Sequence, residues 1–140
     1  MTTVPSLSAE TARRMIDAAG RRAGELGAAV SIAVVDRGGN VIALLRLDGA
    51  TFLASTIATN KAITAAGLGL PTGDFAKFAA DDPALLAGMS NQPQVAAFPG
   101  GFPVLTGDGP AGAIGVAGGR TAEEDLAVAQ AGLAAVPAAA

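Results

Sequence analysis

The 140-residue chain contains no histidine, cysteine, tryptophan or tyrosine. Without histidine and cysteine there is no imidazole base, no thiolate nucleophile, and no zinc or iron–sulfur site of the usual kind. The absence of cysteine also excludes disulfides. Any reaction on this chain must therefore use carboxylates, lysine, arginine, hydroxyl groups or backbone amides, and we expect no metal site.

Charged residues are also scarce, at 15% of the chain against about 25% in typical soluble domains, whereas apolar residues make up 51%. A chain with so few charges has little polar material to cover its surface, so we expect a homo-oligomer that buries apolar surface. The net charge of −3 argues against a nucleic acid partner. The one basic cluster is attributed to the wet face of a helix and consists of Arg13, Arg14, Arg21 and Arg22.

No apolar run approaches the roughly 18 residues needed to cross a bilayer. The N-terminus lacks a basic region followed by an apolar stretch, so we expect no secretory signal. These observations predict a soluble, cytoplasmic protein with no membrane partner. The length suits one domain over residues 1–140 with a single core.

Hydrophobic periodicity and turn signals predict the order helix, hairpin, helix, short helical segments, hairpin, helix. The predicted elements are a helix capped by Ser8 and Gly27, strands over 30–36 and 41–47, a helix over 51–67, short helices capped by Thr72 and Asp82, strands over 102–105 and 111–117, and a last helix with a capping box of Thr121 and Glu124. Both strands of the first hairpin are apolar on both faces, so we expect the sheet to be covered on two sides or to lie at a subunit contact. The pattern predicts an α+β domain, an antiparallel sheet with helices packed on it.

Lys61 is the only charged residue in the helix predicted over residues 51–67. A nearly uncharged helix is usually buried, so this ammonium must either reach water or meet a carboxylate. Desolvation would lower its pKa and make it a candidate base, Schiff-base donor or anion anchor. The structural alternative is a lysine that only caps or pairs.

Three further charges flank the first predicted hairpin, namely Asp36, Arg46 and Asp48. Arg46 interrupts an apolar strand, which is costly unless its guanidinium reaches water or an anion. Together these groups could bind a carboxylate or do acid–base work. The alternative for the aspartates is turn chemistry, because aspartate is favoured before glycine-containing turns. For the carboxylates of residues 123–125, at the start of the last helix, the macrodipole is a sufficient explanation.

Aromatic residues and paired glycines gather in the irregular middle of the chain. Loops that carry phenylalanine often line apolar ligand pockets, and glycine lets the backbone approach a ligand closely. The alternative is that they pin loops and allow tight packing. We expect one pocket that gathers Lys61, Arg46 and the loop from Phe98 to Phe102. The predicted catalytic residues are Lys61, Arg46 and Asp48, and the predicted ligand-binding residues are Asp36, Asn60, Thr64, Phe98, Gly100, Gly101 and Phe102.

Four segments, in order along the chain, resemble the GlcG/HbpS-like family, also called DUF336 or the haem-degrading-protein family. They are SIAVVDRGGNVIALLRLDGA (31–50), NKAITAAGLGLPT (60–72), PGGFPVL (99–105) and GAIGVAGG (112–119). The resemblance implies a profilin-like α/β/α domain with a central antiparallel sheet of about five strands. It also implies homo-oligomers, from dimers to octamers, and an association with haem in some members.

Haem proteins usually hold iron through His, Tyr, Cys or Met. From that set this chain offers only Met1, Met15 and Met89, with Lys61 as a weak substitute. We therefore expect no cofactor, and any haem to bind without iron coordination. Two functions are compatible with these residues. The first is an oligomeric binding protein for a tetrapyrrole or another small organic molecule. The second is a cofactor-independent isomerase, lyase or hydrolase that uses Lys, Arg and Asp.

Overall fold

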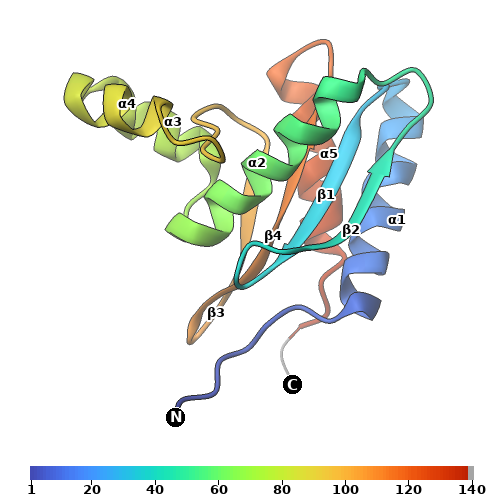
Figure 1. Ribbon diagram of the computed structural model, residues 1–140. Helices are drawn as coiled ribbons and strands as arrows, with labels where there is room; N and C mark the ends of the chain where they lie inside the picture. Colours follow the sequence, from blue (N-terminus) through green and yellow to red (C-terminus); the bar gives the residue numbers. More distant parts are fainter. Residues whose placement is uncertain (139–140) are drawn as a thin grey trace.

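The computed structural model describes residues 1–138, which form an α+β domain with helices on both faces of one sheet (Figure 1). The elements are α1 (Ala9–Leu26), β1 (Ser31–Asp36), β2 (Val41–Arg46), α2 (Phe52–Leu68), α3 (Thr72–Ala80), α4 (Pro83–Ser90), β3 (Gly101–Thr106), β4 (Gly109–Ala117) and α5 (Ala122–Ala134). The sheet order is β2-β1-β4-β3, and all neighbouring strands are antiparallel.

The antiparallel sheet is confirmed, but it has four strands within residues 1–138 where about five were expected. Two hairpins, β1–β2 and β3–β4, join through the pairing of β1 with β4. Turn and strand signals in the sequence had indicated only these four segments. The fifth strand came from the family resemblance alone.

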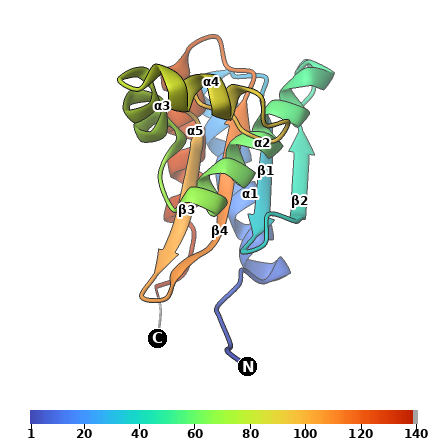
Figure 2. The same ribbon diagram turned by 60° about the vertical axis from the view of Figure 1, so that its left-hand side comes forward.

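Helices α1 and α5 cover one face of the sheet and α2 covers the other (Figures 1 and 2). Successive residues of β1 alternate between the two layers. Ile32 and Val34 pack with α1 and α5, whereas Ala33 and Val35 pack with α2. Strand β1 is therefore buried on both faces, as predicted, whereas the prediction of cover on two sides is wrong for the edge strand β2, which is partly exposed in one copy of the chain.

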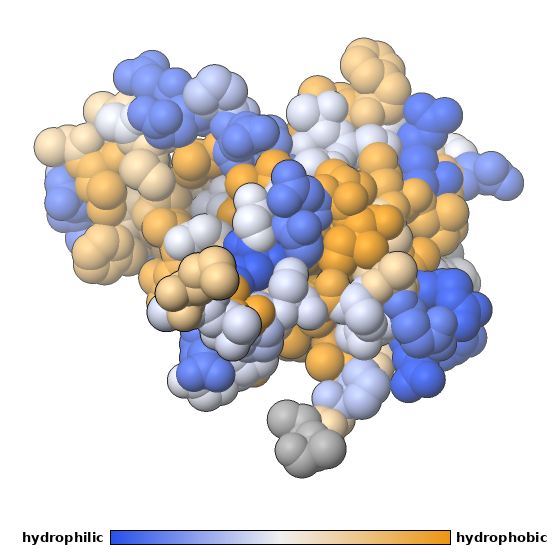
Figure 3. Space-filling view, turned by 60° about the horizontal axis from the view of Figure 1, so that its bottom comes forward, coloured by the Kyte–Doolittle hydropathy of each residue, from blue (hydrophilic) through white to orange (hydrophobic). Residues whose placement is uncertain are grey.

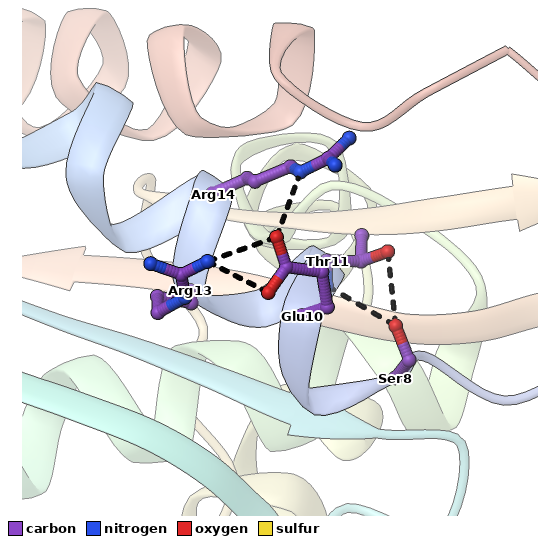
Figure 4. Close-up of polar contacts among 5 residues, drawn as sticks. All are labelled: Ser8, Glu10, Thr11, Arg13 and Arg14. Carbon is purple, nitrogen blue, oxygen red and sulfur yellow. Dashed lines mark hydrogen bonds and ion pairs between the residues drawn. The ribbon is translucent and has the colours of Figure 1, made fainter.

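The first helix begins and ends as predicted, and Figure 4 shows the contacts at its beginning. The Ser8 hydroxyl accepts a hydrogen bond from the Thr11 N–H, and Gly27 closes the helix in the left-handed region with φ 63°. Arg13 and Arg14 both bind the carboxylate of Glu10 on the exposed side of the helix. The basic cluster is thus solvated helix surface, as expected.

Two predicted helix starts need correction. Thr72 does not cap α3, because Pro71 takes that position and the buried Thr72 hydroxyl instead accepts from the Gly101 N–H at 2.8 Å. Only half of the predicted capping box forms at α5. Thr121 accepts from the Glu124 N–H, but the Glu124 carboxylate accepts from the backbone of Arg120, whose guanidinium also binds it.

Helix α2 lies unusually close to the sheet. A Cβ at Gly115 of β4 would collide with the carbonyl oxygen of Ala58, so only glycine permits this approach. The helix buries a row of small side chains against the sheet, namely Ala54, Ala58, Ala62, Ala65 and Ala66. The close contact fixes where the side chain of Lys61 can go.

Helices α3 and α4 extend away from the body of the domain (Figures 1 and 2). Helix α4 has no fully buried residue, although it begins as predicted with Asp82 as N-cap and Pro83 in the first turn. Among residues 1–138, no helix is both long enough and apolar enough to cross a membrane.

Candidate functional site

Lys61 is buried, with 2% of its surface exposed, and is the largest fully buried side chain among the described residues. Its Nζ donates to the Val116 carbonyl oxygen at 2.7 Å and forms an ion pair with Asp125 Oδ2 at 3.1 Å. The same Nζ lies 5.0 Å from the centroid of the Phe98 ring, a cation–π distance. Of the two alternatives drawn from the sequence, the ammonium meets a carboxylate instead of reaching water.

The paired glycines of the β3 entry make room for this lysine. A Cβ at Gly100 would lie 2.7 Å from Lys61 Nζ and 2.6 Å from the Val116 oxygen. Gly100 also has φ 128°, a conformation that side-chain-bearing residues rarely adopt. A Cβ at Gly101 would collide with the Lys61 backbone. Both glycines are therefore part of the wall that holds Lys61.

Asp125, the partner of Lys61, was not predicted as a site residue. It lies in the first turn of α5, and its Oδ1 accepts from the Gly119 N–H at 2.8 Å. A signal for its burial was present, because Asp125, Val128, Ala129 and Gly132 follow helical spacing on one face and all four are buried. The helical spacing was overlooked because the helix macrodipole already explained a carboxylate at this position.

Burial lowers the pKa of the Lys61 ammonium, and the nearby Asp125 carboxylate partly opposes that effect. Lys61 is consequently closer to losing its proton than an exposed lysine is. Asp125 is placed to receive that proton through the hydrogen bond between them. The pair therefore has the parts needed for proton transfer.

Lys61 and Asp125 lie on the wall of a cavity of about 310 Å³, here called the Lys61 cavity. Its other walls come from α2, the segment before β3 and the β4–α5 turn, and include Ile57, Phe98, Pro99 and Arg120. The Arg120 guanidinium binds Glu124 at 2.6 Å and donates to the Leu26 carbonyl oxygen at 3.0 Å. Both cations of this cavity are thus already paired.

The structure brings Lys61 and Phe98 together as expected, but it does not bring Arg46 or Asp48 to the Lys61 cavity. Arg46 lies at the end of the edge strand β2 and is exposed. Asp48 lies in the turn that follows and is exposed too. Phe102 also points away, because it packs with the core on the α1 side of the sheet. The expected single pocket therefore needs correction at these three residues.

Asp36 lies at the opposite end of β1 from this cavity, paired with Gly112 of β4. Its carboxylate accepts from the N–H groups of Gly38 and Asn40, each at 2.9 Å. Those bonds, led by the one from Asn40, lower the pKa of Asp36. This is the turn chemistry that the sequence analysis gave as the alternative.

Asn60 and Thr64 tie the segment after α4 to helix α2. Thr64 Oγ1 accepts from the Ala96 N–H at 2.9 Å, and Asn60 Nδ2 donates to the Pro93 carbonyl oxygen at 3.4 Å. Thr64 also lines a second cavity of about 490 Å³, which we call the Met89 cavity. It is lined by uncharged residues, including Ile63, Leu68, Met89, Gln94 and Val95.

The family model described as "Haem degrading protein HbpS-like" matches residues 7–134. An uncharacterized 15.0 kDa protein from the dhaT-dhaS intergenic region of Citrobacter freundii is 34% identical over 132 residues, which cover 93% of this chain and 92% of that protein.

Two solved structures are similar in fold as well as in sequence. A double mutant of HbpS from Streptomyces reticuli is 36% identical with a TM-score of 0.90, covering 99% of this chain and 92% of that one. A PduOC:heme complex is 29% identical with a TM-score of 0.85, covering 95% of this chain and 96% of that one.

Proposed function

The chain belongs to the HbpS-like family of haem-degrading proteins, and on that premise we propose that it binds a small organic molecule in the Lys61 cavity. The observation that carries the proposal is the buried ion pair of Lys61 and Asp125 on the cavity wall. A buried ion pair is seldom worth more to stability than well-packed apolar side chains of the same volume. Perturbed ionisable groups beside a cavity are characteristic of functional sites.

Haem is named for the family and is bound in the similar PduOC:heme complex, but the residues of this chain do not fit coordination of its iron. The chain has no His, Cys or Tyr. Met15 is fully buried in the core, and Lys61 Nζ is held by Asp125 and Val116. Met89 lines the larger cavity without any ionisable neighbour on its walls. We propose that a tetrapyrrole, where bound, is held by apolar contacts alone.

A haemin titration tests this point. We expect a shift of the Soret band without a six-coordinate low-spin spectrum, and the same spectrum in a Met89→Leu variant. Tight stoichiometric binding with a six-coordinate low-spin spectrum would contradict the proposal.

Acid–base catalysis is a second candidate function, favoured by the hydrogen bond between Lys61 and Asp125. A cofactor-independent isomerase, lyase or hydrolase needs one group to remove a proton and another to return it. Asp125 takes the role that the sequence analysis gave to Arg46 and Asp48. Turnover that is lost in both Lys61→Met and Asp125→Asn would favour this function over simple binding.

We also propose that the protein is a homo-oligomer. Large apolar side chains are exposed on β2 and at the start of α2, including Val41, Leu44, Phe52 and Leu53, with Phe52 at 79%. Figure 3 shows apolar surface on one face of the domain between groups of hydrophilic residues. Burial against further copies would remove this surface from water. A stable monomer at micromolar concentration in light scattering would end the proposal.

Ligand-observed NMR with a library of small organic acids, alcohols and aldehydes tests the binding site. We expect hits whose signals broaden with the wild type but not with Lys61→Met. Lys77→Met is the matched control, because Lys77 is the chain's other lysine and is exposed on α3. Hits that survive in Lys61→Met would place the ligand elsewhere.

A further inference from the structure

We propose that Lys61 is a nucleophilic amine that forms a reversible imine with small neutral aldehydes or ketones in the Lys61 cavity. This inference rests on the proposed binding site and names the class of its ligand. It follows from the charges that surround the cavity, the hydrogen bonds of Nζ, and the position of the Phe98 ring.

The charges around the cavity favour a neutral ligand over an anion. Asp125 is paired with Lys61 and Glu124 with Arg120, so each cation of the cavity wall is already balanced by a carboxylate. Glu123 adds a further carboxylate in the first turn of α5. Three carboxylates against two cations disfavour an anionic ligand here, whereas a neutral carbonyl compound brings no charge to this site.

The hydrogen bonds of Nζ prepare it for attack. The Val116 carbonyl oxygen accepts one N–H and fixes the direction of the amine, while Asp125 Oδ2 is placed to take the ammonium proton. Burial lowers the pKa of Lys61, which favours the neutral amine with its free electron pair. The Phe98 ring lies over the same nitrogen and offers an apolar face to the carbon chain of a ligand.

The reaction balances with no further reactant. The ammonium gives its proton to Asp125, and the amine electron pair forms a C–N bond to the carbonyl carbon while the C=O π electrons move to oxygen. That oxygen takes one of the two protons left on the attacking nitrogen, which gives a neutral carbinolamine. The proton held by Asp125 then passes to the hydroxyl, which leaves as water while the nitrogen electron pair forms the C=N bond, so a protonated imine and the Asp125 carboxylate remain. Hydrolysis reverses every step, so a carbonyl compound is held covalently and released unchanged.

Reductive trapping tests the inference on the wild-type protein. Benzaldehyde or propanal is added with sodium cyanoborohydride at pH 7, and the modified amines are located by peptide mass spectrometry. The chain has only two lysines, so exposed Lys77 serves as an internal comparison. We expect Lys61 to be alkylated faster than Lys77 by on the order of 100-fold, the lower end of what a positioned proton-transfer group contributes. Alkylation of Lys61 no faster than that of Lys77 would overturn the inference.

Matched variants and ligands separate this result from the proposed binding function. Lys61→Arg keeps the cation and should abolish the fast adduct, whereas Lys77→Arg should leave it unchanged. Benzyl alcohol has the shape of benzaldehyde but forms no imine, so its NMR signals report non-covalent binding alone. Slow trapping would overturn only the imine if the NMR signals of benzyl alcohol still broaden with the wild type and not with Lys61→Met. If neither fast trapping nor binding of benzyl alcohol is observed, the Lys61 cavity would be overturned as the ligand site as well.

Discussion

The cations near the two edges of the sheet differ in burial and in pairing. At the β3 edge, Lys61 is buried against Asp125, and the strand entry is closed by Gly100 and Gly101. At the β2 edge, Arg46 is exposed, and none of the hydrogen bonds or ion pairs of residues 1–138 involves its side chain. The difference is that Lys61 has a backbone carbonyl and a carboxylate within hydrogen-bond distance, whereas Arg46 extends into solvent.

The cause of the difference is what covers each edge. Helix α2 and the segment before β3 close over the first residues of β3, which are buried or half-buried. Residues 1–138 of a single copy provide no such cover at the β2 edge, and Val41 and Leu44, on the same strand as Arg46, are about half exposed. An apolar edge strand left open is a ready surface for another chain.

Removal of the Asp125 charge should have the largest effect on the β3 edge. Asp125→Asn can still accept from the Gly119 N–H, but it leaves the Lys61 ammonium buried without a counter-charge. We expect the free energy of unfolding to fall by about 3–5 kcal/mol in urea denaturation. Glu123→Gln, in the same helical turn but exposed, is the control and should change it by less than about 0.5 kcal/mol. Equal effects of the two variants would contradict the buried pair.

Substitution of Gly100, which packs against Lys61, should cause the second-largest loss of stability. Gly100→Ala places a Cβ 2.6 Å from the Val116 oxygen and 2.7 Å from Lys61 Nζ, at a positive φ. We expect a loss of about 1–3 kcal/mol in thermal unfolding and a displaced Lys61. Gly24→Ala in α1 is the control, since its Cβ meets nothing within 4 Å. That variant should gain about 0.5–1 kcal/mol from helix propensity.

A smaller effect should appear in the pH dependence of stability. Because burial lowers the pKa of folded Lys61 below its ordinary 10.5, the unfolded chain binds more protons between those two values. The stability of the wild type relative to Lys61→Met should therefore rise with pH through this window and stay constant below it. Denaturant unfolding between neutral pH and pH 10.5 measures the difference. A relative stability that falls with pH would mean that Asp125 raises the pKa more than burial lowers it.

Substitution at the open edge should have the smallest effect on the fold of one copy. Arg46→Ala removes an exposed side chain, and the free energy of unfolding should change by less than about 0.5 kcal/mol. Imine trapping at Lys61 should also be unchanged, because Arg46 does not line that cavity. A loss of trapping in Arg46→Ala would restore the shared pocket that the sequence analysis expected.

Much of the fold could be predicted from the sequence, because its signals are local. Ser8, Gly27, Thr51 and Asp82 all lie at helix ends. The single charge on an apolar helix indicated Lys61 as a candidate, and the paired glycines indicated either a ligand pocket or tight packing. In the structure the glycines serve as packing for Lys61.

The rest depends on which segments meet in space. The sequence cannot show that α5 presents Asp125 to Lys61, since the two residues are 64 positions apart. The sequence also does not show that Arg46 lies on an exposed edge strand, because an edge strand and a central strand can have the same apolar pattern. Phe102 was grouped with Gly101 as a ligand-binding residue, but successive residues of a strand face opposite sides of the sheet, and Phe102 packs on the α1 side.

The alanine and glycine contact between α2 and β4 also has a consequence for conformational entropy. Alanine and glycine lose no rotamer freedom on burial, so this layer of the fold forms without a side-chain entropy cost. Among the buried residues of α2, Lys61 and Thr64 are the exceptions, and Lys61 is the longer of the two. Its four-carbon chain loses about 1.5–2 kcal/mol of rotamer freedom when it is fixed. That cost is met in folding, before any ligand arrives, so a ligand of the Lys61 cavity meets an amine that is already immobilised.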